Sequence, residues 1–221
     1  MNNDLTANLK SLTLDDVPPF YDEPAEAARD VEVGLDEDHV LIRKPTRRRA
    51  FNALHLSNLS KALERLPEDG ESWHIVCKGN WPAWSLVPRT LDLIAPARIS
   101  WLGIATLGFS RDNVDELVQM LDAGDVAKCD LLFSCYFKSN EETLTGFLTH
   151  EMRRRDQRVN AIRTHAKIIA IETTDGQGIV VESSANLRSC RNVEQFTITN
   201  DHMLLNFHRQ WINQLVQRGS S

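Results

Sequence analysis

The chain has 221 residues, of which 42% are hydrophobic and 25% are charged, a composition typical of a globular protein. No apolar run approaches the roughly 20 residues that a membrane span needs, and the first residues lack the apolar block of a secretory signal. The four cysteines (Cys77, Cys129, Cys135, Cys190) fit no zinc-ligand spacing. We therefore expect a cytoplasmic protein with reduced thiols, no membrane association, no metal and no cofactor.

The net charge of −6 is unevenly distributed along the chain. Residues 1–38 contain eleven acidic residues against two basic ones, a balance of −9, whereas the remaining residues carry a balance of +3. We expect this first segment to be largely irregular. Two interpretations stay open for it: a solubilising tail, or a phosphate mimic that lies across a basic groove.

Strand patterns and helix patterns alternate through the rest of the chain. They predict strands at residues 39–42, 73–77, 98–109, 129–137, 159–171, 179–183 and 194–198, and helices at residues 51–63, 85–94, 112–121, 140–155 and 202–216. Ser110 is the expected N-cap of the third helix, and Gly124 follows its end. The fold class is therefore α/β, a mixed β-sheet flanked by helices on both faces. We expect a single domain over residues 39–216 and a polar tail over residues 217–221.

The most informative stretch runs from residue 164 to residue 194. His165 and Lys167 lie two apart at the start of an apolar run, and alternation along a strand sends both side chains to one face. A Thr-Asp-Gly-Gln-Gly turn predicts a hairpin, which would bring Ser184 and Asn186 back beside that pair. A base or nucleophile, a fixed cation and two neutral hydrogen-bonding groups indicate a phosphate-handling site. Taken alone, His165 could equally be a satisfied core histidine.

This stretch resembles the phospholipase D superfamily, whose members share a His-x-Lys-x4-Asp signature, a Gly-Ser-x-Asn-like turn and a later acidic residue. His165 and Lys167 match the signature, Ser184 and Asn186 match the turn, and Glu194 is the later acid. Glu172 stands in place of the family's aspartate and Ser183 in place of its glycine. Ten residues separate Glu172 from Ser183, where the common pattern has six. The order of elements over residues 98–216 also fits the family.

The resemblance implies a phospholipase D-like fold and a metal-independent reaction. His165 would attack phosphorus to give a phosphohistidine that water resolves. Lys167 and Asn186 would stabilise the phosphoryl oxygens together with Ser184, and Glu194 could hold the tautomer of His165. We assign Glu172 and Ser183 to structural support.

The chain contains a single copy of the motif, because none of the other histidines is followed by a lysine two residues later. Family members need a second histidine to protonate the leaving oxygen. The resemblance therefore implies a homodimer with its site at the two-fold interface.

Basic residues suggest where a polymeric substrate would lie. The clusters at residues 43–49 and 153–158, with Arg163 and Arg188, are candidates for phosphate contacts. Equally, Arg153 to Arg155 could form a solvated helix C-terminus. The five tryptophans are expected mostly in the core, although Trp81 and Trp84, predicted in a loop, could stack on bases.

The first functional hypothesis is a phosphodiesterase, a nuclease acting on DNA as a homodimer. The alternative is a catalytically inactive phospholipase D-like protein that binds nucleic acid or assembles with other proteins. Phospholipid hydrolysis ranks last, because the sequence lacks a hydrophobic docking surface.

Overall fold

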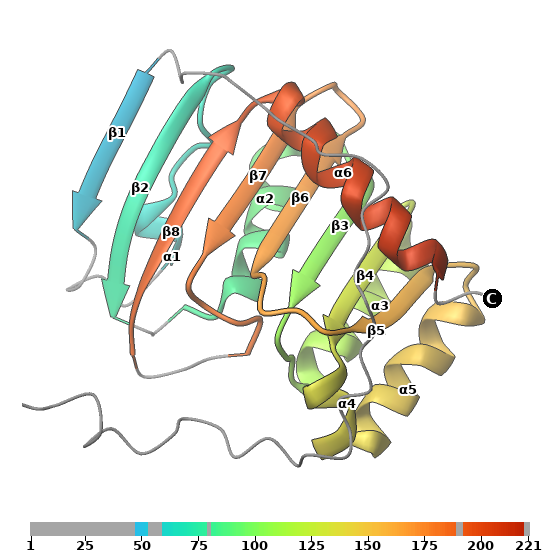
Figure 1. Cartoon of the computed structure of the whole chain (residues 1–221). Coiled ribbons are helices and arrows are strands. Elements are labelled where there is room, and N and C mark those ends of the chain that lie inside the picture. Colours follow the sequence, from blue (N-terminus) through green and yellow to red (C-terminus); the bar gives the residue numbers. More distant parts are fainter. Residues whose placement is uncertain (1–46, 53–58, 79–80, 189–191, 219–221) are drawn as a thin grey trace, which may run out of the picture. The chain divides into compact units, whose positions relative to one another are not determined.

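The computed structural model describes residues 47–52, 59–78, 81–188 and 192–218. Within these ranges the strands form one eight-stranded sheet in the order β1-β2-β8-β7-β6-β3-β4-β5 (Figure 1). The strands are β1 (Arg47–Asn52), β2 (Glu71–Lys78), β3 (Ile99–Thr106), β4 (Cys129–Ser134), β5 (Arg158–Ile162), β6 (Ile168–Thr173), β7 (Gly178–Ser183) and β8 (Val193–Asn200). The sheet is mixed: β1–β2, β3–β4 and β4–β5 pair in parallel, and the other pairs are antiparallel.

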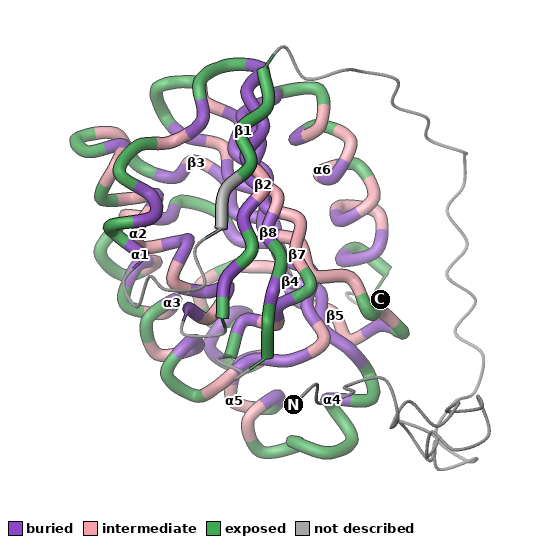
Figure 2. The backbone as a smooth tube through the Cα atoms, turned by 90° about the vertical axis from the view of Figure 1, so that its left-hand side faces the viewer, coloured by how far each residue is buried: buried purple, intermediate pink, exposed green. Residues whose placement is uncertain are grey.

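Helices cover both faces of this sheet. The helix α6 (His202–Gln217) packs on one face, where Leu205 and Ile212 join the cluster that includes Ala170 and Val180. The opposite face carries α1 (Leu59–Ala62), α2 (Leu86–Ile94), α3 (Arg111–Ala123) and α5 (Glu142–Arg153), whose apolar residues form the larger cluster. The short helices η2 (Ala83–Ser85) and α4 (Cys135–Asn140) complete the described elements. Figure 2 shows buried residues concentrated along the sheet, with β1 exposed at its edge.

These observations confirm the predicted fold class, a mixed sheet flanked by helices on both faces. The predicted cap is also present, because Ser110 and Asn113 bond reciprocally in a capping box at the start of α3. Gly124 ends this helix with a φ of 74°, a conformation that favours glycine. The predicted strand at 39–42 and the boundary at residue 38 lie outside the described residues.

Three predicted elements were wrong in their extent. Residues 47–52 form β1, so the helix expected from residue 51 starts only at α1. The strand expected over 129–137 stops at Ser134, whose side chain accepts a 3.2 Å hydrogen bond from the backbone of Tyr136 and caps α4. The strand expected over 159–171 is broken into β5 and β6. Because β3 and β4 lie between β5 and β6 in the sheet, the chain must leave the sheet to cross them.

Among the described residues, no helix combines the length and the apolar character that crossing a membrane requires.

Candidate functional site

The residues of the motif lie at one end of the strands in the middle of the sheet. His165 and Lys167 lie in the crossing segment just before β6, and Ser184 and Asn186 follow β7. The register places Ile168 opposite Glu182, and Ser183 opposite Phe196 of β8. The start of β6, the end of β7 and the start of β8 therefore lie at the same end of the strands, which we call the site edge. The β6–β7 hairpin has its turn at the opposite end of these strands, as the Thr-Asp-Gly-Gln-Gly sequence predicted.

His165 and Lys167 are in direct contact. The Nζ atom of Lys167 lies 2.9 Å from Nδ1 of His165 and also donates a 2.8 Å hydrogen bond to the carbonyl oxygen of His165. His165 is exposed, whereas Lys167 is partly buried. Because a protonated lysine can only donate, Nδ1 is the acceptor and a neutral imidazole carries its proton on Nε2. If His165 is the nucleophile, as the motif predicts, attack through Nε2 would require the opposite tautomer, and the Lys167 contact would have to open first.

Glu194 supplies the buried carboxylate of the site. It is 7% exposed and accepts a hydrogen bond from the hydroxyl of Ser184. The same hydroxyl accepts a 3.0 Å bond from the backbone of Gln195, so Ser184 is fixed in orientation toward Glu194. Partial burial lowers the pKa of Lys167, and the negative charge of Glu194 opposes this shift. Lys167 therefore lies within electrostatic reach of both His165 and Glu194.

Asn186 presents an unsatisfied amide oxygen. Its backbone carbonyl accepts a 3.3 Å bond from Ala83, but its Oδ1 atom is buried without a hydrogen-bond partner among the described residues. Leaving such a group unpaired costs about 1–3 kcal/mol, and native proteins do so rarely. Because amide oxygen and nitrogen occupy similar volumes, a rotated Asn186 would present its NH2 group, the donor that a phosphate oxygen requires.

The two residues assigned to structural support hold different parts of the sheet. Ser183 donates a 3.1 Å backbone hydrogen bond to the carbonyl of Lys167, which ties β7 to the segment carrying the motif. Glu172 lies at the far end of β6, where it accepts hydrogen bonds from Nη1 of Arg209 in α6 and from Ser100, each at 3.0 Å. The hydrogen bond from Arg209 holds the pKa of Glu172 below its ordinary value. Glu172 therefore links the sheet to α6.

The candidate substrate-binding arginines are both exposed. Arg163 follows the end of β5 at the site edge. The guanidinium of Arg188 lies 5.9 Å from the ring centroid of Phe137 in α4, so it borders that helix.

The two loop tryptophans are core residues, as was expected for most of the tryptophans, and their possible role in base stacking is wrong. Trp81 and Trp84 are 4% and 3% exposed, and the indole nitrogen of Trp84 donates to Glu116. Two exposed residues of α4, Tyr136 and Lys138, were not among the predicted site residues. Tyr136 falls within the strand predicted over residues 129–137 and Lys138 directly follows it. The signal for a helix here was Ser134, a residue type that commonly caps helices.

No group of three or more metal-ligating side chains converges within the part of the chain that the structure describes.

No family model and no curated protein matches the sequence. Three solved structures are similar in fold. Nuc from Salmonella typhimurium, a phospholipase D family member, has 15% identity over 67% of this chain and 96% of its own, with a TM-score of 0.49. TrmBL2, an archaeal chromatin protein, has 15% identity over 74% of this chain and 59% of its own, with a TM-score of 0.46. Polyphosphate kinase from Porphyromonas gingivalis has 19% identity over 70% of this chain and 28% of its own, with a TM-score of 0.50.

The chain thus spans little more than half of the chromatin protein and less than a third of the kinase. At these identities the comparisons concern the fold alone. The fold is α/β, with a phospholipase D family member among its structural neighbours.

Proposed function

We propose that this protein is a metal-independent phosphodiesterase, a nuclease that acts on DNA as a homodimer. The observation that carries the proposal is the site edge itself, where Lys167 contacts His165 and lies near the buried Glu194. The unpaired amide of Asn186 follows the neighbouring strand. An exposed imidazole, a cation and an unused polar group are what attack on an anionic diester requires.

The proposed reaction has two steps. The phosphate displaces the Lys167 contact, so that the ammonium pairs with a phosphoryl oxygen and Nδ1 of His165 takes up the ring proton. Nε2 then forms a bond to phosphorus while the bond to the leaving oxygen breaks. That oxygen receives a proton from His165 of the second protomer. The same second histidine then removes a proton from water, whose oxygen displaces Nε2 and releases the phosphate product.

The dimer is part of this proposal because the chain carries one motif and the reaction needs two histidines. His165 is exposed, as a residue at an interface between two copies must be in the isolated chain. A two-fold axis at the site edge would place each His165 opposite the other.

A second function is favoured by one specific observation. Lys167, rather than a carboxylate, occupies Nδ1 of His165, and this contact holds the imidazole in the tautomer that cannot attack through Nε2. A protein fixed in this arrangement would bind phosphates without cleaving them. The alternative is therefore a catalytically inactive nucleic-acid-binding or assembly protein.

The test compares the wild type with His165→Ala on supercoiled plasmid and on single-stranded DNA in the presence of a chelator. The proposal expects cleavage by the wild type and none by the variant. Binding of DNA without cleavage by the wild type supports the alternative, and cleavage that survives in the variant or requires added metal overturns the proposed reaction. A phospholipid vesicle assay run in parallel addresses lipid hydrolysis.

A further inference from the structure

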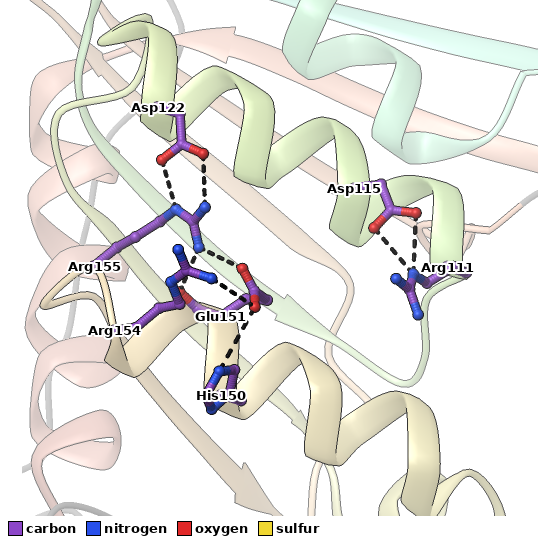
Figure 3. A network of polar contacts seen from close by, with 7 residues as sticks. All are labelled: Arg111, Asp115, Asp122, His150, Glu151, Arg154 and Arg155. Atoms are coloured by element: carbon purple, nitrogen blue, oxygen red, sulfur yellow. Dashed lines mark hydrogen bonds and ion pairs between the residues drawn. The ribbon is translucent and has the colours of Figure 1, made fainter.

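The basic residues at the end of α5 divide into two groups with different environments. Arg155 donates to Asp122 at 2.6–2.7 Å and to Glu151 at 2.5 Å, and it links α5 to α3 (Figure 3). Arg158 donates two 2.6 Å bonds to the buried Asp130. These two arginines are committed to the fold. Arg153 is exposed and has no ion-pair partner among the described residues.

A hollow of about 790 Å³ lies along the exposed side of α5, within the range of about 300–1,000 Å³ typical of ligand clefts. Its lining has one carboxylate, from Glu142, and three permanent cations, from Lys138, Arg153 and Arg154. Of these, Arg154 also pairs with Glu151 at 3.4 Å. The full lining, which we call the α4–α5 groove, consists of Lys138, Glu142, Thr145, Gly146, Thr149, His150, Arg153 and Arg154. The groove is therefore suited to an anionic ligand.

The middle of the groove is open to close approach. Gly146 lies inside α5, where glycine costs about 1 kcal/mol relative to alanine. A Cβ atom at this position would meet nothing within 4 Å, so the fold itself does not require glycine. The hydroxyls of Thr145 and Thr149 bond to backbone carbonyls of their own helix, at 3.0 and 2.7 Å. No large side chain therefore projects from the middle of the groove, between the basic residues at its two ends.

The helix α4 connects the site edge to the α4–α5 groove. This helix starts directly after β4, and Ser134 at the end of β4 pairs with Ile162, three residues before His165. Arg188 from the site edge lies over Phe137, and Lys138, the next residue, lines the groove. Figure 1 shows α4 where β4 ends, with α5 following it. Tyr136 lies on the same helix and is 41% exposed.

We propose that the α4–α5 groove binds the backbone of a single-stranded nucleic acid as it leaves the site edge, with Tyr136 stacking on a base. A basic track combined with an exposed aromatic ring is how proteins hold single strands without sequence preference. This inference rests on the proposed function and adds to it a substrate form and residues outside the motif. Lys138 and Arg153 supply the charge, and Gly146 leaves room for the strand.

The test measures binding of a fluorescein-labelled 20-nucleotide single strand by anisotropy over a range of salt concentrations. The variant Lys138→Glu/Arg153→Glu is compared with Lys61→Glu/Lys128→Glu, which makes the same charge change at exposed positions of α1 and of the segment before β4. We expect the first variant to bind at least about 10-fold more weakly and its salt slope to fall by about 1.4, from two lost phosphate contacts. The control should retain wild-type affinity.

Tyr136 is tested separately. We expect Tyr136→Ala to weaken binding by about 5-fold or more and Tyr136→Phe to preserve it, because stacking needs the ring and not the hydroxyl. Circular dichroism confirms that each variant is folded.

Unchanged affinity in Lys138→Glu/Arg153→Glu, or an equal loss in the control, overturns the inference. Tighter binding by that variant also overturns it. Turnover of bis(p-nitrophenyl) phosphate, which is too short to reach the groove, should be unchanged in both variants. If the wild type cleaves no diester, the proposed function fails. The anisotropy comparison still tests whether the α4–α5 groove binds single-stranded nucleic acid.

Discussion

Replacing Asp130 by Asn tests how much the network between β3, β4 and β5 contributes to stability. Asp130 is fully buried and accepts 2.6 Å hydrogen bonds from the indole nitrogen of Trp101 and from two nitrogens of Arg158. Gly103 makes room for this indole, because a Cβ there would lie 2.2 Å from the ring. Asparagine keeps the shape but removes the charge, and its NH2 group must face one of the donors.

Removing one partner of a buried ion pair costs about 3–5 kcal/mol when the other charge stays buried and unpaired. Because the side chain of Arg158 is partly exposed and also donates to Asn213, we expect a loss toward the lower end of this range. If the free energy of unfolding falls by about 2 kcal/mol per molar urea, this loss lowers the urea midpoint of unfolding by roughly 2 M. The matched control is Asp115→Asn, which breaks the exposed pair with Arg111 on α3 and should cost only about 0.3–0.5 kcal/mol. If Asp130→Asn lowers the free energy of urea unfolding by less than about 1 kcal/mol, the network around Asp130 does not stabilise the fold as described.

Two further predictions concern α3 and β2. Ser110→Ala removes half of the capping box with Asn113 and should lower the free energy of unfolding by about 1 kcal/mol, measured by urea unfolding; an unchanged midpoint contradicts the assignment of the cap. The hydrogen bond from Arg65 lowers the pKa of Glu71 to about 2. Because this folded-state value is below the unfolded one, the stabilisation is fully present above about pH 4.5 and is lost as the pH falls toward 2. Glu71→Gln should therefore lose less stability than the wild type over that pH range. Melting temperatures that fall in parallel for the two proteins as the pH is lowered would contradict this.

The sequence carries most of the information about the fold in its periodicity. Apolar alternation located β2, β3, β7 and β8, and the residues that flank α3 located its two ends. Periodicity did not locate the break at residues 163–167, because the strand order that separates β5 from β6 depends on contacts distant in sequence.

Two contacts among the candidate site residues follow from the sequence pattern. The spacing of His165 and Lys167 predicted that they lie close together, and the hairpin brings Ser183, at the end of β7, beside Lys167. The lysine at Nδ1 of the imidazole could not be predicted, because it depends on rotamers in an irregular segment. The burial of Trp81 and Trp84 depends in the same way on packing, such as the stacking of Trp81 near Phe196 at 6.4 Å between ring centroids.

The most direct test of the central claim is to trap the covalent intermediate. A diester labelled with 32P at the scissile phosphate is mixed with the protein in chelator, quenched with base within milliseconds and digested for mass spectrometry. The proposed reaction predicts a base-stable phosphohistidine at His165, absent in His165→Ala and present in Lys138→Glu/Arg153→Glu. Product formed at the wild-type rate with no label on His165, or with label on another residue, would contradict it.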